Sequence, residues 1–366
     1  MAPTTPESLA TRRRVMLLVT GAGRSGTSSM AGTLDRLGLL VPEPVVGANK
    51  HNPRGHYEPQ WVVDLHKKYL KRARVSTLDG DPAAVDLVDK VFATDEVRGQ
   101  IRSWLRDLPT DGSDVVVKDP RTFWGAKTWT EVARSAGYDV RFLTMLRHPA
   151  EVVGSRSAHY SRATNELEHR REEIANLAGW LNVNLINEAT TRGASRAFVL
   201  YEELLADWRL ALAPAVTDLE LDLGEQLAPG RHHDVDDFIE PSLRRVVATW
   251  EGTDLPETLR GLADDAWTAL AARARGDIDD QDLGERLDSV RTSYRAYYED
   301  SAMVVTNRVN RQTSDARRAG RRASVEGPGE TSVATHTSGI SARDLVGEVW
   351  RRGKSKTGRI VGRSSR

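Results

Sequence analysis

Four short apolar runs stand out along the chain, at residues 15–20, 115–117, 140–146 and 197–201. Each run is rich in Val, Leu, Met or Phe and is followed at once by glycine, charged residues or a polar turn. Continuous apolar runs of this length are typical of strands that are buried on both faces of a sheet. The pattern therefore predicts four short, buried strands.

The segments between these runs carry apolar residues at helical spacing. After the first run, Met30, Leu34 and Leu37 fall at positions i, i+4 and i+7, and residues 165–191 show a long helical pattern. Strands that alternate with helices predict crossover connections and a parallel sheet covered on both faces. The expected fold class is α/β, a central parallel sheet flanked by helices, with a helical excursion from the sheet at residues 66–112.

Composition divides the chain into three parts. Residues 14–305 are predicted to form the α/β domain, between a flexible N-terminus at 1–13 and a basic tail at 306–366. The 366 residues have a net charge of zero, but residues 311–366 carry 13 Lys and Arg against 5 Asp and Glu, a balance of +8. With few apolar residues, this tail is predicted to be disordered. The tail either contacts anionic lipid at a membrane surface or is a solvated segment. We slightly favour the solvated segment.

The same composition narrows the classes of function. The chain contains no cysteine, which excludes disulfides, thiolate metal sites and cysteine nucleophiles. No apolar run approaches the roughly 20 residues that cross a bilayer, and residues 1–14 lack the apolar core of a secretory signal. We therefore expect a cytoplasmic protein. No recognisable nucleic-acid-binding module is present, and no histidine has the spacing of a metal ligand.

The segment GAGRSGTSSM at residues 21–30 joins the first strand to the first helix. A glycine turn before a helix N-terminus can bind phosphate, because backbone N–H groups converge there and the helix dipole adds positive charge. The segment fits G-x-x-x-x-G-K-[ST] except that Thr27 replaces the lysine. It also fits G-x-G-x-x-G, but the acidic residue which that motif requires would be Glu43, between two prolines.

A third pattern fits better. The segment RSGTS at residues 24–28 resembles the [KR]-S-G-T-[ST] loop with which sulfotransferases hold the 5′-phosphosulfate of PAPS (3′-phosphoadenosine 5′-phosphosulfate). The resemblance to bacterial PAPS-dependent sulfotransferases extends from about residue 15 to about residue 245. Arg147, followed eight residues later by Ser155, matches the arginine and serine that hold the 3′-phosphate in that family. Arginine offers a planar fork to phosphate oxygens, and serine adds a neutral donor.

Two further segments extend the resemblance, and one family motif is missing. VLYEEL at residues 199–204 is similar to the family's Tyr-Glu-[Asp/Glu]-Leu, which implies that Tyr201 lies against the adenine. FIEPSLR at 238–244 resembles a recurrent late segment to which no chemical role is assigned. The Arg-Lys-Gly motif of cytosolic eukaryotic sulfotransferases is absent, which leaves the remaining 3′-phosphate contacts unassigned.

Sulfuryl transfer requires positive charge at the leaving phosphate and a base for the acceptor proton. Arg24 stands at the position of the family's loop lysine, and Lys118 and Arg121 follow the second strand, where either could reach the sulfuryl oxygens. The segment NPRGHYE at 52–58 resembles the family segment that places a glutamate beside the acceptor hydroxyl, which makes Glu58 the predicted base. His56, His51 and Asp119 are the alternatives.

The resemblance implies a P-loop NTPase-like sulfotransferase fold. The implied reaction transfers the sulfuryl group from PAPS, with release of PAP, to a hydroxyl of a carbohydrate, glycolipid or small metabolite, without a metal. The predicted catalytic residues are Glu58, Arg24, Lys118 and His56. The predicted donor-binding residues are Gly23, Arg24, Ser25, Gly26, Thr27, Ser28, Arg121, Arg147, Ser155 and Tyr201. A P-loop nucleotide or small-molecule kinase, a dinucleotide-dependent oxidoreductase and a non-catalytic nucleotide-binding partner remain as alternatives.

Overall fold

The computed structural model describes residues 13–325, except for residues 50, 51, 53 and 241–247. The chain divides into two compact units, Met1–Tyr294 and Arg295–Arg366. The first unit contains the whole sheet and the candidate site. Of the second unit, the described part is the continuation of the last helix.

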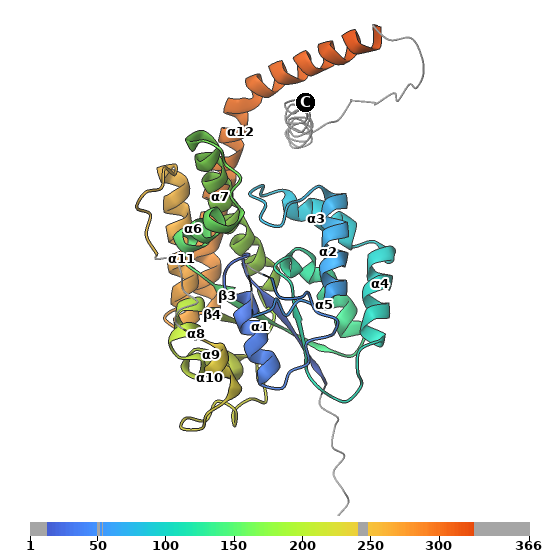
Figure 1. Cartoon of the computed structure of the whole chain (residues 1–366), viewed down its shortest axis with the longest axis vertical. Helices are drawn as coiled ribbons and strands as arrows, with labels where there is room; N and C mark the ends of the chain where they lie inside the picture. The colour runs from blue at the N-terminus through green and yellow to red at the C-terminus, as the bar shows by residue number, and fades with distance from the viewer. Residues whose placement is uncertain (1–12, 50–51, 53, 241–247, 326–366) are drawn as a thin grey trace, which may run out of the picture. The chain divides into compact units, whose positions relative to one another are not determined.

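Four parallel strands form the centre of the first unit (Figure 1). They are β1 (Val15–Thr20), β2 (Val115–Lys118), β3 (Asp139–Leu146) and β4 (Arg196–Leu200), in the order β2-β1-β3-β4. All residues of β1, β2 and β4 are buried, as expected for strands covered on both faces. The structure confirms the predicted α/β class and the four predicted strands.

Helices cover both faces of the sheet. On one face, Val15, Leu17 and Val19 pack in a core with α1 (Thr27–Arg36), α8 (Tyr201–Ala206), α9 (Trp208–Asp218) and α10 (Asp234–Phe238). Side chains alternate along a strand, so Met16 and Leu18 face the other side. There α5 (Ala126–Ser135) packs on β3, and α7 (Glu166–Thr191) is fixed to β3 by a hydrogen bond from Asn187 Nδ2 to Thr144 Oγ1 of 2.9 Å.

Three helices lie between α1 and β2, where the helical excursion is predicted. They are α2 (Gln60–Ala73), α3 (Ala84–Phe92) and α4 (Asp95–Arg106), so the helical segment begins before residue 66. Figure 1 shows the three grouped together beside α5. The 3-10 helix η1 (Thr122–Gly125) follows β2 along the chain. The helix α6 (Pro149–Tyr160), which directly follows β3, is not predicted by the apolar spacing.

The last two helices are α11 (Glu257–Arg275) and α12 (Asp280–Val325). Because α12 continues through residues 306–325, the prediction of disorder from residue 306 is wrong for this stretch, and residues 326–366 lie outside the described part of the chain. Met303, Val304 and Val305 of α12 are exposed large apolar residues. Among the described helices, none combines the length and apolar character needed to cross a bilayer.

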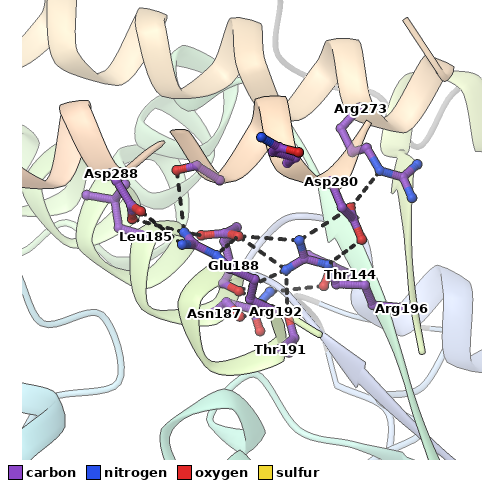
Figure 2. Close-up of polar contacts among 12 residues, drawn as sticks. Thr144, Leu185, Asn187, Glu188, Thr191, Arg192, Arg196, Arg273, Asp280 and Asp288 are labelled. Atoms are coloured by element: carbon purple, nitrogen blue, oxygen red, sulfur yellow. Dashed lines mark hydrogen bonds and ion pairs between the residues drawn. The ribbon is translucent and has the colours of Figure 1, made fainter. Parts of the chain in front are cut away.

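A buried network of charged side chains joins α7, β4, α11 and the first turns of α12 (Figure 2). At its centre, the carboxylate of Glu188 accepts hydrogen bonds from Arg192 at 2.7 and 2.9 Å and from Arg196 at 3.3 Å. Arg196 also pairs with Asp280 at 3.3 Å, and Arg192 pairs with Asp288 at 2.9 Å. The hydrogen bonds that Arg192 donates to Glu188 and Asp288 raise its pKa above the ordinary value. Every arginine drawn here has a carboxylate partner.

Candidate functional site

The strand order places a topological switch between β1 and β3. From β1 the chain continues to β2 on one side of β1 and later to β3 on the other side. Thr20 pairs with Thr144, and Val19 pairs with Lys118, so the strands end at one edge of the sheet. Ligands of parallel α/β sheets bind at such an edge, next to the switch. The predicted residues of the glycine loop, of the β2 end and of the β3 end all lie there.

The loop after β1 has the backbone conformation of an anion cradle. Arg24 and Gly26 both have positive φ values, 80° and 88°, and α1 begins directly after Gly26. Gly26 has no side chain that could cap the helix, so the first N–H groups of α1 remain available as donors. Ser25 Oγ is buried and has no hydrogen-bond partner within the described residues. A bound anion would satisfy these groups.

Tyr201 supports the loop from beneath. Its ring packs directly against Gly26, where even a methyl group would overlap the ring. Burial raises the pKa of the Tyr201 hydroxyl above its ordinary value, although Arg147 and a hydrogen bond with Ser29 oppose this. With 6% of its surface exposed, Tyr201 holds the loop in place. The adenine contact of this residue stays a prediction.

Two arginines lie beside the loop without a counter-charge. Arg24 Nε donates to Ser155 Oγ at 3.0 Å, and Arg156 Nε donates to Asn176 Oδ1 at 2.7 Å. Both guanidinium groups also face the ring of Tyr160, at 5.9 and 5.5 Å. No carboxylate in the described part of the chain forms an ion pair with either arginine.

Arg156 is partly buried and lies near the charge of Arg24. Burial lowers its pKa below the ordinary value, the neighbouring Tyr160 opposes the shift, and Arg24 lowers the pKa further. A methyl group added to Gly23 would lie 3.8 Å from the Nη1 atom of Arg156, so this guanidinium faces the glycine loop. The positive charges of Arg24 and Arg156 therefore lie near each other beside the glycine loop.

Arg147, by contrast, is neutralised inside the protein. Its Nε donates to Glu151 Oε2 at 2.7 Å, and its Nη1 donates to the carbonyl oxygen of Arg24 at 3.0 Å. Both Arg147 and Glu151 are buried. Arg147 therefore fixes the loop backbone, whereas its predicted partner Ser155 faces Arg24. Contact of Arg147 with a 3′-phosphate stays a prediction.

Lys118 connects the loop to the predicted base. Its ammonium group donates to Ser28 Oγ at 2.9 Å, to the His56 carbonyl oxygen at 3.0 Å and to Glu58 Oε1 at 2.6 Å. An ammonium group has three N–H donors, and all three are used here. Arg121 lies on the other side of Glu58, with 3.8 Å between its Nη2 and Oε2. The structure thus brings Glu58, Lys118, Arg121 and Ser28 together. Glu58 and Lys118 are 60 positions apart in the sequence.

A buried chain of hydrogen bonds lies behind Arg121. Asp119 accepts from Arg121 Nε at 2.7 Å and contacts His66 Nδ1 at 3.0 Å, while Trp129 Nε1 lies 2.9 Å from His66 Nε2. The indole N–H can only donate, so His66 Nε2 accepts and Nδ1 carries the proton donated to Asp119. Burial alone would raise the pKa of Asp119, but His66 and Arg121 together lower it to about 2. Asp119 therefore orients Arg121 as a fixed carboxylate.

The remaining candidate bases occupy different positions. His56 Nε2 contacts Asn49 Nδ2 at 2.9 Å, and His56 Nδ1 lies 4.0 Å from Glu58. Burial lowers the pKa of His56, Glu58 opposes this, and Lys118 and Arg24 lower it further. His51 lies outside the described residues, as does most of the segment 238–244. Glu43 accepts a hydrogen bond from Val45 N in a loop and does not end a strand of the sheet.

Sequence reasoning missed three residues of this site: Arg156, Glu151 and His66. A signal existed for the first two. Arg156 and Tyr160 are four residues apart on α6, where side chains at this spacing meet. Arg147, which precedes α6, lies four residues before Glu151. His66 had no such signal, because its contact with Asp119 spans 53 positions. Over the described residues, no cluster of three His, Asp or Glu could hold a metal ion.

Comparisons with known proteins yield distant structural matches. No protein-family model and no curated protein matches the chain. The sulfotransferase domain of the olefin synthase from Synechococcus PCC 7002 is similar over 69% of this chain and 95% of that domain, with 18% identity and a TM-score of 0.39. The sulfotransferase domain from the curacin biosynthetic pathway covers 69% of this chain and 96% of its own length, with 14% identity and a TM-score of 0.37.

Both of these solved structures are sulfotransferase domains. Likeness at this level is too distant to establish an activity, and the residues at the edge of the sheet have to carry that conclusion.

Proposed function

We propose that the protein is a PAPS-dependent sulfotransferase that acts on an acceptor hydroxyl. The observation that carries the proposal is the pair Arg24 and Arg156, which lies beside a glycine loop without a carboxylate partner in the described residues. Uncompensated, partly buried arginines are unfavourable unless a ligand supplies the opposite charge. The loop and this pair together favour a ligand with two anionic groups.

The two parts of the site suit the two ends of such a donor. The N–H groups after Gly26 and the hydroxyls of Ser25, Thr27 and Ser28 suit a phosphosulfate, since a helix N-terminus attracts anions. The guanidinium groups of Arg24 and Arg156 suit a second phosphate, and the hydroxyl of Ser155, which accepts from Arg24, lies beside them. A phosphate on the 3′-oxygen of the ribose, separate from the 5′-phosphosulfate, distinguishes PAPS from ATP, and a glycine loop alone does not explain a separate pair of arginines.

The donor, when bound, supplies the sulfuryl group, which leaves its phosphate oxygen and forms a new S–O bond to the acceptor hydroxyl. The role that we propose for Glu58 is to accept the hydroxyl proton in this exchange. Lys118 holds Glu58 at 2.6 Å and Ser28 at 2.9 Å, and so orients the base toward the loop. Its positive charge would stabilise negative charge on the leaving phosphate. We propose a carbohydrate, glycolipid or small metabolite as acceptor.

The test is a calorimetric titration of the protein with PAP, ATP and NADP⁺, followed by an assay of sulfuryl transfer from PAPS to a panel of hydroxyl acceptors. Arg156→Ala is a better test variant than Arg147→Ala, because removing Arg147 leaves Glu151 buried without its cation. We expect micromolar PAP binding that Arg156→Ala weakens at least tenfold.

The rival functions give different results in the same experiment. Binding of ATP in preference to PAP would support a kinase, and binding of NADP⁺ alone would support an oxidoreductase; either result overturns the proposal. If PAP binds but no acceptor reacts, and Glu58→Gln leaves all measured properties unchanged, the protein is a nucleotide-binding partner without catalysis. The proposal therefore stands on PAP binding and on a loss of turnover in Glu58→Gln.

A further inference from the structure

A second basic hollow lies at the opposite edge of the sheet from the glycine loop. This cavity of about 430 Å³ is lined by Arg14, Arg102 and Arg106 together with Leu105, Leu108 and Tyr138. Arg14 directly precedes β1 and Tyr138 directly precedes β3, so the cavity lies where these strands begin. The edge that carries the candidate active site is where the strands end.

The three arginines of this cavity lack carboxylate partners in the described part of the chain. Arg102 and Arg106 are exposed and lie one turn apart on α4. Arg14 is held by neutral acceptors: its Nε donates to the Ser113 carbonyl oxygen and its Nη1 to that of Pro109, both at 2.8 Å. The remaining nitrogen, Nη2, is buried and has no acceptor. The nearby Asp111 instead accepts from the backbone N–H of Ser113 at 3.0 Å.

The positive charge of the three arginines is partly offset by the helices that end at this hollow. The carboxyl ends of α4 and α5 both contribute lining residues, and each helix end carries roughly half a negative charge. Two such ends offset about one of the three guanidinium charges. The carboxylate of Asp111, whose pKa is lowered by its hydrogen bonds with Ser113 and by the charge of Arg14, offsets about one more charge. An excess of about one positive charge remains beside an apolar wall, where Leu105 and Leu108 are buried.

We propose that this hollow binds a small phosphate monoester, with the dianionic phosphate among the three arginines and an apolar group against Leu105 and Leu108. Arg102 and Arg106 contact the phosphate from α4, and Tyr138 Oη, which lies 3.4 Å from Arg14 Nη1, adds a neutral donor. The site is independent of the proposed sulfotransferase reaction, because it is formed by the other edge of the sheet.

The experiment is a calorimetric titration with phenyl phosphate of the full chain carrying Arg24→Ala and Arg156→Ala, which removes the two free arginines of the loop. Onto this protein we add Arg102→Gln and Arg106→Gln. Both side chains are exposed on α4, so the fold is expected to persist, whereas Arg14 holds two backbone carbonyls and is left intact. The matched control is Arg286→Gln, which removes an exposed arginine from α12.

We expect phenyl phosphate to bind the loop variant and the two α4 substitutions to weaken its Kd at least tenfold, with Arg286→Gln within twofold of its parent. Phenyl sulfate, which carries a single negative charge, is expected to bind more weakly than the phosphate. The proposal is overturned if phenyl phosphate does not bind the loop variant. It is also overturned if the α4 substitutions weaken binding no more than Arg286→Gln does.

Discussion

Two groups of arginines in this protein have opposite surroundings. In the network of Figure 2, Arg192 and Arg196 share the buried carboxylate of Glu188, and Asp288 and Asp280 add a second carboxylate to each. Beside the glycine loop, Arg24 and Arg156 contact only Ser155, Asn176 and the ring of Tyr160 among the described side chains and carbonyls. The same side chain is thus fully compensated in one place and uncompensated in the other.

We interpret the first group as structural charge and propose that the second group is kept for a ligand. A buried ion pair becomes strongly destabilising when one partner is removed, because the other remains buried and uncompensated. An arginine without a carboxylate makes no such contribution, and removing it relieves repulsion between like charges. Stability and ligand affinity should therefore respond in opposite ways to changes in the two groups.

The largest loss of stability is expected from Glu188→Gln. Glu188 is 1% exposed and accepts from Arg192, Arg196 and Arg291, so the amide would leave three guanidinium groups without a central charge. We expect the free energy of unfolding to fall by about 3–5 kcal/mol, measured by urea denaturation.

The control is Asp288→Asn, at the exposed end of the same network. Asp288 also pairs with Arg192, but half of its side chain is exposed. We expect a loss below about 1 kcal/mol. Equal losses for the two variants would show that burial does not decide the contribution of these pairs.

The next largest effect is expected from Gly26→Ala. Alanine at a φ of 88° is strained by roughly 1–2 kcal/mol, and the new methyl group would overlap the Tyr201 ring. The loop must shift to relieve the overlap, so PAP affinity should fall at least tenfold in the titration described above.

Gly38→Ala separates the two causes. Gly38 also has a positive φ, 94°, but nothing lies within 4 Å of an added methyl group. We expect a similar strain, of roughly 1–2 kcal/mol, with PAP affinity within twofold of the wild type. A tenfold loss of affinity in both variants would place its cause in general destabilisation and not in the shape of the loop.

The comparison of the two arginine groups also shows what a sequence can predict. The strands were predicted closely, because continuous runs such as residues 15–20 and 140–146 are buried on both faces and have no competing pattern. The loop was predicted from its glycines and the helix start after Gly26. Helix α6 was not, since its apolar residues are few and its interior contains Gly154.

The charge partners could not be predicted in the same way. Lys118 pairs with Glu58, 60 positions away, and not with the adjacent Asp119, which pairs with Arg121 and His66. A carboxylate four positions away compensates Arg147 and Arg192, and that spacing can be read from the sequence. Whether Arg24 and Arg156 have a carboxylate partner depends on contacts between distant segments, which spacing does not record. The ligand-binding role that we propose for Arg156 therefore required the structure, although Ser155, its neighbour, was predicted from the sequence.

For stability, the combined variant Arg24→Ala and Arg156→Ala is expected to show almost no effect. Since neither arginine has a carboxylate partner in the described residues, the free energy of unfolding should stay within about 0.5 kcal/mol of the wild type or rise. PAP affinity should fall strongly, because hydrogen bonds to charged groups are worth about 1.5–3 kcal/mol each. Urea denaturation and PAP titration of the same samples measure both. A loss of stability near that of Glu188→Gln would show that the loop arginines are structural.

The smallest expected effect is on the pH dependence of stability, through His56 beside the glycine loop. Burial and the nearby charges of Lys118 and Arg24 lower the pKa of His56, against the opposing influence of Glu58. The unfolded chain, with an ordinary histidine pKa near 6.5, therefore binds more protons than the folded chain just below that pH. Stability is complete above pH 6.5 and falls as the pH drops toward the lower folded pKa. His56→Gln should reduce this fall, whereas His232→Gln, which changes an exposed histidine, should not.

Saturation with PAP then links the pH effect to the uncompensated arginines. Negative charge bound beside Arg24 and Lys118 would offset the two cations that lower the pKa of His56, and the pKa should rise toward its ordinary value. The destabilisation below pH 6.5 should accordingly shrink in the PAP complex of the wild type and remain unchanged in the complex of His56→Gln. Urea denaturation across this pH range, with and without PAP, measures the difference. If PAP binds but leaves the wild-type pH dependence unchanged, the ligand's charge does not lie beside these cations, and the loop arginines are not its binding site.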